Sequence, residues 1–335
     1  MKKMTAIAAM MIMAGSMAMS CNGSKNQAEN SEQQDSTFVT PLHVEGLYLL
    51  NAKGDTMVLN GPSLGWHSNW GRFYNDSTVM AFKKNWGANI TRAAIGAHTS
   101  WDVVNCYDAD SIDAMNKLYR VIDAAIANDM YVIADWHTHK NTLENAKKFF
   151  SAVTEKYGDT PNILYEIWNE PETVKWDEVK AYAEEVIPVI RKKAPNSVII
   201  VGSPTWDQDV DIASESPLKY DNLLYSLHFY AATHKQPLID KAEKAIANGL
   251  PLIISECGGM EATGDGPVDE ESMQKWVEFA DKHKLSMLFW SIADKTETCS
   301  MVTPDASDNG MLWTEEQIKP WGKTAKTIIK KRNHK

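Results

Sequence analysis

Two glutamates stand at the ends of strongly apolar segments, where a buried strand would reach a surface. Glu170 ends the segment at residues 162–170 and is followed by Pro171, while Glu256 follows an apolar run that starts at residue 250. The apolar residues before each glutamate indicate a partly buried setting. Two carboxyl groups that face one another across a cleft, one protonated and one ionised, can cleave a glycosidic bond. We therefore take this pair as the candidate chemistry of the chain.

Other apolar segments also end in polar or aromatic groups. Arg92 and Tyr230 could supply a positive charge and a hydrogen bond to an ionised carboxylate. Structural alternatives exist, because Arg92 could pair with Asp135 and His228 could be a hydrogen-bonded core histidine. The convergence of so many polar and aromatic groups at the ends of the segments, on one face of the fold, favours a functional site over these structural alternatives. The other segment-end groups are Trp66, His67, Trp136, His137, Asn169, Thr205, Trp206 and Trp290.

Tryptophan is abundant, with twelve in the chain. Flat indole rings next to hydrogen-bonding groups suit sugars, whose faces are apolar and whose edges are polar. Three tryptophans, Trp86, Trp276 and Trp321, fall on predicted helices and are expected in the core. Those at or beside segment ends, which are candidates for sugar contacts, are Trp66, Trp70, Trp136, Trp168, Trp206 and Trp290.

These segments alternate with amphipathic helices along most of the chain. From residue 38 onward we count eight strand–helix units, with one uncertain helix at residues 207–219. The strands are continuously apolar, as parallel strands covered on both faces are. This pattern predicts a single-domain α/β protein, a (β/α)8 TIM barrel, whose site lies at the C-terminal ends of the strands. A doubly wound open sheet is the alternative, but the glycine-rich phosphate turn typical of it is missing after the first strand.

Finer features of the fold are also predicted. A short N-terminal β-hairpin is expected over residues 46–59, with its turn at Lys53, Gly54 and Asp55. The first long helix is expected to be capped by Ser77 or Thr78. In the segment at residues 163–168, which we expect to cross the barrel wall, Glu166 has two possible positions. It could pair with a basic group inside the barrel or point toward the helices.

Six motifs resemble, in order and spacing, those of family 5 glycoside hydrolases, and in particular the bacterial endo-β-1,4-glucanase (cellulase) subgroup. They are NITRAA, DWH, ILYEIWNEP, LHFYAATH, LIISECG and FWSIADKTE, and the resemblance covers roughly residues 42–325. It implies a retaining double displacement in which Glu170 is the acid/base and Glu256 is the nucleophile. The implied substrate is a cellulose-like or mixed-linkage β-glucan, with mannan, xylan and xyloglucan as same-fold alternatives.

The resemblance also implies supporting roles. Arg92 would keep Glu256 ionised, Tyr230 would donate a hydrogen bond to it, and Asn169 would bind a sugar 2-hydroxyl group. Two departures leave the expected contacts from Trp66 and Trp70 open: Gly96 replaces a common aromatic residue, and the GWHSNWGR loop is unusual. The remaining implied roles are lining of the central subsite (His137 and His228), sugar stacking (Trp290), hydrogen bonding on the non-reducing side (Lys295) and contact on the leaving-group side (Trp206).

The N-terminus predicts export. Residues 1–20 have a basic start, an apolar stretch and small residues before Cys21, as in a lipoprotein signal peptide. We expect lipidation of Cys21, a disordered tether over residues 21–37 and a catalytic domain over residues 38–335, anchored to a bacterial membrane. An ordinary cleaved signal peptide is the alternative.

The charge and the cysteine content limit the classes of partner and cofactor that the chain is expected to bind. A formal net charge of -10 and no long basic segment argue against nucleic acid. Cys106, Cys257 and Cys299 show no CxxC spacing, so no zinc site or disulfide framework is indicated, and we expect a monomer without cofactor or metal. Two rival classes remain. One is a non-catalytic glycan-binding lipoprotein; the other is a metal-dependent barrel hydrolase built on His137 and His139, with His67, His228 and His234 as further ligands.

Overall fold

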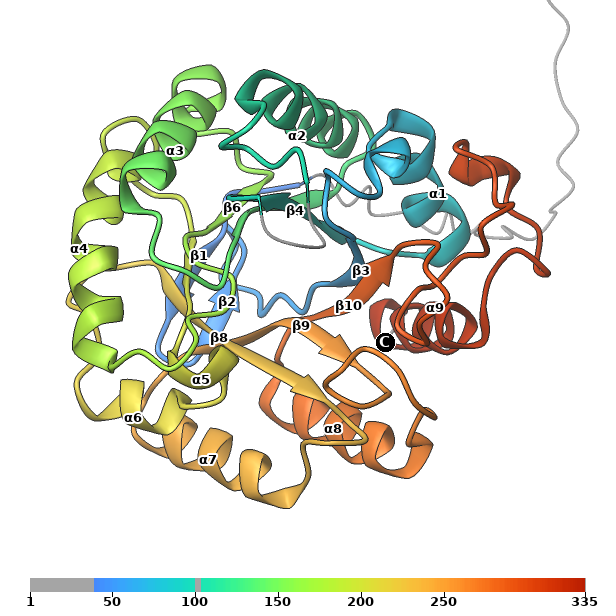
Figure 1. The fold of residues 1–335 in the computed structure, drawn as a ribbon. Coiled ribbons are helices and arrows are strands. Elements are labelled where there is room, and N and C mark those ends of the chain that lie inside the picture. Colours follow the sequence, from blue (N-terminus) through green and yellow to red (C-terminus); the bar gives the residue numbers. More distant parts are fainter. Residues whose placement is uncertain (1–38, 100–103, 335) are drawn as a thin grey trace, which may run out of the picture. The chain divides into compact units, whose positions relative to one another are not determined.

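The computed structural model describes residues 39–99 and 104–334. The predicted signal peptide, Cys21 and the predicted tether lie outside these residues. Within the described ranges the sheet is a closed barrel of parallel strands, surrounded by helices (Figure 1). The strands, in the order β10-β3-β4-β5-β6-β7-β8-β9 around the barrel, are β3 (Asn60–Leu64), β4 (Ile90–Gly96), β5 (Tyr131–His137), β6 (Ile163–Glu166), β7 (Ile199–Val201), β8 (Leu223–Tyr230), β9 (Leu252–Gly258) and β10 (Met287–Ile292). The fold predicted from the sequence, a (β/α)8 barrel, is confirmed.

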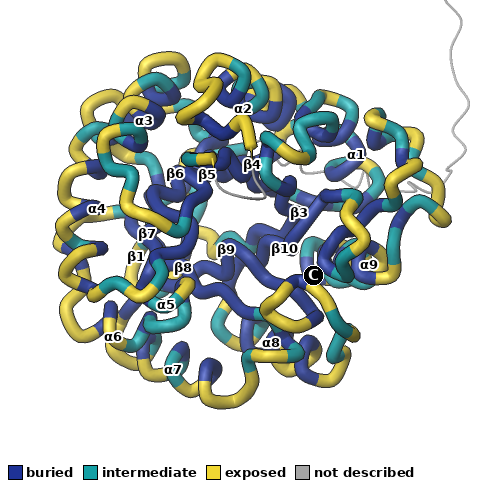
Figure 2. The backbone as a smooth tube through the Cα atoms, viewed as in Figure 1, coloured by how far each residue is buried: buried dark blue, intermediate teal, exposed yellow. Residues whose placement is uncertain are grey.

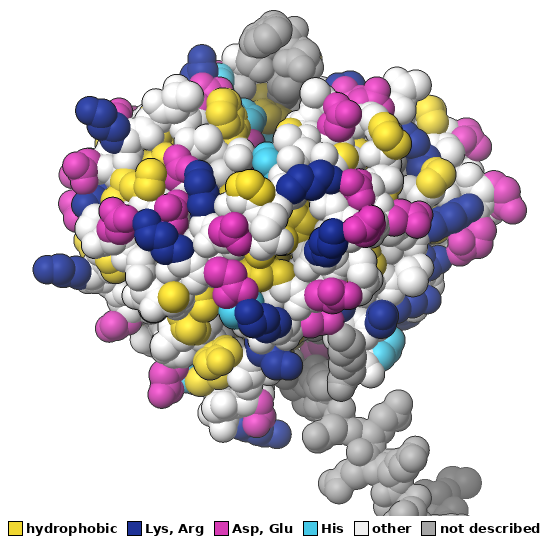
Figure 3. Space-filling model, turned by 90° about the horizontal axis from the view of Figure 1, so that it is seen from below, with side chains coloured by type: hydrophobic (Ala, Val, Ile, Leu, Met, Phe, Trp, Pro, Cys, Tyr) yellow, Lys and Arg dark blue, Asp and Glu magenta, His cyan; other side chains and the backbone are white. Residues whose placement is uncertain are grey.

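The helices follow the strands in sequence and cover the outside of the barrel. Their inner faces are buried and their outer faces are exposed (Figure 2), which is the distribution that amphipathic sequences dictate. On the face shown in Figure 3, acidic and basic side chains are interspersed among other groups, as on a solvated surface. The helices are α1 (Asp76–Trp86), α2 (Ser111–Ala127), α3 (Leu143–Tyr157), α4 (Trp176–Arg191), α5 (Pro204–Asp207), α6 (Val210–Glu215), α7 (Gln236–Ala247), α8 (Glu270–His283) and α9 (Pro320–Asn333), with short 3-10 turns η1 (Gly71–Phe73) and η2 (Gly310–Leu312). Among the described residues, no helix is both long enough and apolar enough to span a bilayer.

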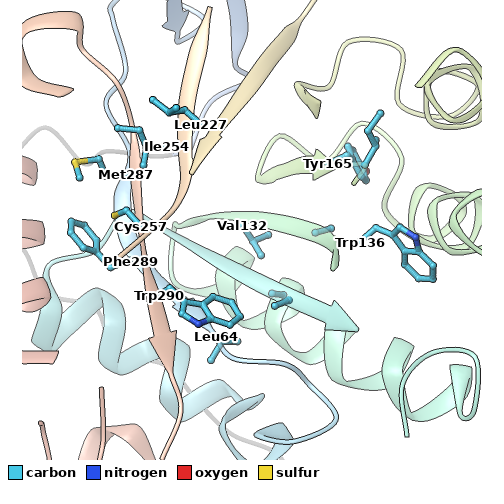
Figure 4. Close-up of a cluster of buried hydrophobic side chains, with 14 of the residues drawn as sticks. Leu64, Val132, Trp136, Tyr165, Leu227, Ile254, Cys257, Met287, Phe289 and Trp290 are labelled. Atoms are coloured by element: carbon cyan, nitrogen blue, oxygen red, sulfur yellow. The ribbon is translucent and has the colours of Figure 1, made fainter. Parts of the chain in front are cut away.

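The outer sides of the strands pack against the helices in a large apolar cluster. Successive side chains of a strand point to opposite faces, so one strand serves both the core and the barrel interior. Figure 4 shows Met287 and Phe289 of β10 on one side of the strand and Trp290 on the other. Packing of Met287 and Phe289 in the core therefore holds β10 in place, and with it Trp290 on the other side of the strand.

The barrel interior is layered along its axis. At the N-terminal ends of the strands, Ile90, Ile133, Leu164 and Leu224 belong to one apolar cluster. Leu42, just before the hairpin, and Leu49 of β2 pack in the same cluster. Two residues further along the strands, the same interior face carries Arg92, Asp135, Glu166 and Ser226, all fully buried. The sequence thus places a polar layer directly above an apolar floor.

The finer predictions are corrected at the hairpin turn and at the cap of the first long helix. The hairpin pairs β1 (His43–Glu45) with β2 (Tyr48–Leu50) around Gly46, which has a φ of 58°, and the predicted turn at residues 53–55 closes only the single bridge between Leu50 and Thr56. Asn75, and not Ser77 or Thr78, caps α1, because its side chain accepts a hydrogen bond from the Thr78 N–H. The segment at residues 207–219, where the sequence left a helix uncertain, contains α6, and the short α5 precedes it.

The strand before Glu170 is also shorter than predicted. Ladder pairing in β6 ends at Glu166, yet the next residues stay tied to both neighbouring strands. The Ile167 N–H donates to the Ile200 carbonyl at 3.0 Å, and the Asn169 N–H donates to the Trp136 carbonyl at 3.2 Å. The chain therefore continues upward without regular pairing and carries Asn169 and Glu170 to the mouth of the barrel.

Candidate active site

Arg92 is the centre of the polar layer. Its guanidinium donates to Glu166 Oε2 at 2.6 Å and to Glu256 Oε2 at 2.9 Å, and Nη2 lies 3.0 Å from Asp135 Oδ2. A further hydrogen bond reaches Asn169 Oδ1. Since Arg92 is fully buried, these acceptors replace the water that a buried cation loses. One arginine thus joins strands β4, β5, β6 and β9.

Glu166, whose position the sequence left open, faces the barrel interior. Burial raises its pKa, but the charges of Arg92 and His228 outweigh burial and leave the pKa below the usual value. The first of the two sequence alternatives, a basic partner inside the barrel, is therefore the one that the structure shows. Arg92 also contacts Asp135, so the structural pairing and the contact with the candidate site occur together.

Glu256 is held from two sides. Arg92 donates to Oε2, and the Tyr230 hydroxyl donates to Oε1 at 2.7 Å. Burial raises the pKa of Glu256, and the nearby charge of Glu170 adds to this effect, while His228, Arg92 and Tyr230 oppose it. Both oxygens have a donor, which favours the ionised form and fixes the orientation of the carboxyl group.

Glu170 is flanked by two imidazole rings. His228 Nδ1 lies 2.9 Å from Glu170 Oε1, and His139 Nδ1 lies 3.4 Å from Glu170 Oε2. The Glu170 N–H donates to the Thr138 carbonyl at 3.2 Å, which attaches Glu170 to the end of β5. One ligand atom each from Glu170, His228 and Glu256 lies within 4.8 Å of the other two. The two carboxyl groups picked out from the sequence therefore face one another at close range.

His137 supports the opposite wall. Its Nδ1 lies 2.7 Å from Asp135 Oδ2, and its ring stacks on Trp290 with centroids 5.1 Å apart and planes at 4°. Burial, followed by the positive charge of Arg92, lowers the pKa of His137 well below the usual value. The neutral ring therefore donates from Nδ1 to Asp135 and leaves Nε2 as an acceptor.

An open groove crosses this mouth. One cavity of about 820 Å³ is lined by Trp66, Trp70, Trp290 and Lys295, and a second of about 510 Å³ holds Glu170, Glu256 and Trp206. Trp66, His139 and Trp290 line both cavities, so the two are adjacent. The Trp206 side chain is among the exposed large apolar groups of the described residues.

Two of the tryptophans proposed for sugar contacts do not reach the groove. Trp136 is fully buried against Phe149 of α3, and Trp168 is buried against Tyr182 of α4. The cause is the alternation of side chains, because Trp136 lies between Asp135 and His137 and so points to the opposite face of β5. Trp66, Trp70, Trp206 and Trp290 all line the groove, including the two whose contacts the unusual loop left open.

Two polar residues of this site are not among those predicted from the sequence. The sequence places His139 only among possible metal ligands, although its position two residues after His137 returns it to the same side. Asp207 was part of an uncertain segment, but its carboxylate Oδ2 lies 3.3 Å from His228 Nε2. Its place immediately after Trp206, at the end of a strand unit, was the available signal.

The metal-dependent rival depends on His137 and His139. Neither histidine belongs to a group of three or more potential ligands with atoms close enough to share an ion, within residues 39–99 and 104–334. His137 Nδ1 is already bonded to Asp135, and His234 Nδ1 accepts the Tyr230 N–H at 2.8 Å. The predicted ligand set therefore does not converge.

A (β/α)8 barrel with two facing carboxyl groups at the C-terminal ends of its strands and an aromatic groove is the arrangement that glycoside hydrolases use. Comparison with known proteins agrees. The family model described as cellulase (glycosyl hydrolase family 5) matches residues 50–296. Endoglucanase Z of Dickeya dadantii is 41% identical over 297 residues, covering 87% of this chain and 66% of the relative. An endoglucanase of Clostridium saccharobutylicum is 36% identical over 309 residues, covering 89% of this chain and 67% of the relative.

Solved structures show the same likeness. A protein from Cytophaga hutchinsonii is 38% identical, with a TM-score of 0.85 over 88% of this chain and 95% of that one. The catalytic domain of a Thermobifida fusca endoglucanase in complex with cellotetraose is 28% identical, with a TM-score of 0.81 over 87% of this chain and 97% of that one. The chain belongs to glycosyl hydrolase family 5. It spans about two thirds or less of the length of the first curated relatives that it matches.

Proposed function

We propose that this chain is an endo-acting, retaining glycoside hydrolase that cleaves β-1,4-glucosidic bonds in cellulose-like or mixed-linkage glucans. The observation that carries the proposal is the proximity of Glu170 and Glu256, which have carboxylate oxygens within 4.8 Å of one another. Retaining enzymes separate their carboxyl groups by about 5 Å, whereas inverting enzymes leave about 6.5–9.5 Å for a water molecule. The spacing therefore favours a direct attack by one carboxylate.

In the first step Glu256 attacks the anomeric carbon, and Glu170 donates its proton to the departing glycosidic oxygen. The C–O bond to the leaving sugar breaks as the bond to Glu256 forms. In the second step the Glu170 carboxylate accepts a proton from water, the resulting oxygen attacks the anomeric carbon, and Glu256 leaves as a carboxylate. Two inversions give net retention of configuration.

The surrounding groups stabilise these steps. Arg92 and Tyr230 orient Glu256 so that a lone pair is presented to the sugar. Because Asn169 Oδ1 accepts from Arg92, its amide NH2 group is left to donate to a sugar 2-hydroxyl, a contact that strengthens toward the transition state. Trp290 would carry the sugar at the cleavage point, with His137 and His228 lining that subsite.

The open groove supports endo action, since a chain can enter from either side. Trp66, Trp70 and Lys295 would bind sugars on the non-reducing side of the cleaved bond, and Trp206 would bind the leaving-group side. Relatives named endoglucanase, and a related structure that holds cellotetraose, support a β-glucan substrate. We further propose that the enzyme acts as a monomer and that its substrate is a soluble polymer.

A substrate panel tests the proposal. Purified protein is assayed on carboxymethylcellulose, barley β-glucan, glucomannan and xylan by viscosity loss and reducing-end release. We expect cleavage of the first three, with viscosity falling before many reducing ends appear, and loss of activity in Glu256→Ala. Activity on mannan or xylan alone would exclude the glucanase. Binding of glucans without any hydrolysis would favour the non-catalytic glycan-binding alternative.

We also propose that the protein is exported and anchored to a bacterial membrane through a lipid on Cys21, with residues 22–37 as a tether. The sequence before Cys21 supports this. Labelling of the bacterial producer with a radioactive fatty acid should mark the protein and leave Cys21→Ser unmarked. Equal labelling of both, or of neither, would exclude the anchor.

A further inference from the structure

Asp207 is a buried carboxylate that the mechanism above does not use. Its Oδ1 accepts the Ser203 N–H at 2.5 Å, while Oδ2 lies 3.3 Å from His228 Nε2. The side chain is fully shielded from solvent, and Oδ2 makes no hydrogen bond of good geometry within the described residues. A buried carboxylate oxygen in this state needs a charged or protonated partner, and His228 is in contact with it.

The backbone around Asp207 is built to hold this position. Thr205, Trp206 and Asp207 all have left-handed backbone conformations, with φ of 57°, 52° and 60°, which non-glycine residues rarely adopt. Such strain persists where surrounding contacts determine the conformation. Here the Thr205 N–H donates to the Glu172 carbonyl and the Trp206 N–H donates to the Pro171 carbonyl, each at 2.9 Å. The turn that buries Asp207 is therefore bonded to the two residues that directly follow Glu170.

Space beside this turn is tightly limited. A Cβ atom at Gly202 would lie 2.5 Å from the Trp168 carbonyl oxygen and 3.0 Å from Asp207 Oδ1. Because Gly202 has no side chain, the backbone at Trp168, just before Glu170, and the Asp207 carboxylate can both lie against it. The arrangement leaves Asp207 little freedom to turn away from His228.

His228 connects Asp207 to Glu170 through its two ring nitrogens. Nδ1 lies 2.9 Å from Glu170 Oε1, and Nε2 lies 2.9 Å from Ser255 Oγ, with Asp207 Oδ2 on the same side. Ionisable groups that influence the His228 ring come from several elements. They are Asp207 on α5, Glu166 on β6, Glu170 after β6, Glu256 on β9, Asp135 and His137 on β5, and His234 after β8.

These groups decide where the protons lie. Burial lowers the pKa of His228, but the charges of Asp207, Glu166 and Glu170 outweigh it and raise the pKa well above its usual value. Burial also raises the pKa of Asp207. The raised pKa keeps the His228 ring protonated on both nitrogens, with Nε2 facing Ser255 Oγ and Asp207 Oδ2. Nδ1 therefore keeps its hydrogen and remains a donor to Glu170 Oε1.

We propose that Asp207 is a positioning residue of the acid/base: through His228 it keeps an N–H donor on Glu170 Oε1, so that Glu170 carries its transferable proton on Oε2. Oε2 is the oxygen that His228 leaves unoccupied, and it lies 3.4 Å from His139, which lines both cavities of the groove. The pairing thus directs the proton of Glu170 toward the bond to be cleaved. This inference rests on the proposed function, and it adds a residue to it.

Asp207→Asn tests the inference, with Asp211→Asn as the matched control. Asp211 lies four residues further along the same segment, and its carboxylate pairs with Lys244 of α7. Two substrates separate acid catalysis from other effects. Cleavage of cellopentaose needs a proton for its sugar leaving group, whereas 2,4-dinitrophenyl β-cellobioside has a leaving group that departs without one.

We expect Asp207→Asn to lower kcat/KM for cellopentaose at least tenfold and to change it less than threefold for the dinitrophenyl substrate. Asp211→Asn should alter neither by more than threefold. Equal losses on both substrates, or no loss on either, would overturn the inference while leaving the proposed function intact. A wild-type protein inactive on both substrates would instead contradict the proposed function.

A second readout does not depend on activity. In protein labelled with ¹⁵N-histidine, His228 signals are assigned by their loss in His228→Gln. The wild type should show both His228 nitrogens protonated at pH 7, and Asp207→Asn should move the titration of this ring to lower pH. Unchanged His228 signals in Asp207→Asn would overturn the inference even if the protein were inactive.

Discussion

Carboxylate oxygens of Glu170 and Glu256 lie within 4.8 Å of one another, although the residues belong to segments separated by two strands of the barrel. Their environments differ. Glu170 contacts two imidazoles, while Glu256 receives hydrogen bonds from Arg92 and Tyr230. Different partners for two neighbouring carboxyl groups are what a division into acid/base and nucleophile requires.

This division predicts different behaviour of the two single variants. Glu170→Ala should lose about 10²–10⁴-fold in turnover of cello-oligosaccharides but retain the first step on 2,4-dinitrophenyl β-cellobioside, because that leaving group needs no proton. Added azide should restore its turnover and give the β-glycosyl azide. Glu256→Ala should lose activity on both substrates, since it has no nucleophile. The measurement is product analysis with and without azide; identical behaviour of the two variants would argue against separate roles.

Arg92 should matter for both stability and activity. Arg92→Met leaves Glu166, Glu256 and Asp135 without their shared cation, and loss of one partner of a buried ion pair costs about 3–5 kcal/mol. We expect a lower free energy of unfolding together with a loss of kcat beyond tenfold in the folded fraction. Arg332→Met is the control, because Arg332 is also a buried arginine but binds Asp281 and the Leu285 carbonyl, away from the groove. A comparable loss of kcat in both variants would contradict a direct role for Arg92.

The acid limb of the pH profile should report Glu256. Its pKa is raised above 4.5, first by burial and then by the charge of Glu170. As the pH falls through this raised pKa, Glu256 gains a proton and loses its nucleophilic lone pair. The fall of kcat/KM on the acid side should therefore have its midpoint above pH 4.5. Tyr230→Phe removes a hydrogen bond to the carboxylate and should shift the limb to higher pH. Tyr182→Phe, whose hydroxyl binds the Ile167 carbonyl, should leave it in place; an unmoved limb in Tyr230→Phe would contradict the assignment.

His67 should make folding sensitive to mild acid. Burial lowers its pKa to about 4, and Nδ1 accepts the Gly96 N–H at 3.0 Å. In the unfolded chain His67 binds a proton near pH 6.5, whereas in the folded chain it stays neutral until the pH approaches 4. The free energy of unfolding therefore decreases as the pH falls from 6.5 toward 4. This residue should contribute about 2 kcal/mol to the loss between pH 7 and pH 5. Urea unfolding of wild type and His67→Gln at both pH values measures it, and an equal pH dependence of the two proteins would refute it.

The sequence predicts the barrel and the main site residues because both follow from short-range patterns. Continuous apolar strands, and polar groups at their C-terminal ends, are visible without knowing any contact. The position of Glu166 also follows once strand alternation is applied, since Leu164 belongs to the interior floor. The same rule would have placed Trp136 against the helices, where it packs on Phe149.

Other features depend on contacts between distant segments. Asp207 approaches His228 only because three residues adopt a left-handed conformation fixed by hydrogen bonds to residues 171 and 172. No local propensity predicts that conformation. The hairpin turn was misplaced for a related reason, because a strong turn signal at residues 53–55 competes with the pairing of β1 and β2 across Gly46.

The proposed mechanism requires that Glu256 forms a covalent bond to the sugar while Glu170 protonates the leaving group. The most direct test is ¹H NMR of cellopentaose hydrolysis during the first minutes, before the product anomers equilibrate. We expect the new reducing end to appear first as the β-anomer and the α-anomer to grow later by mutarotation. Initial formation of the α-anomer would show inversion and would contradict a nucleophilic role for Glu256.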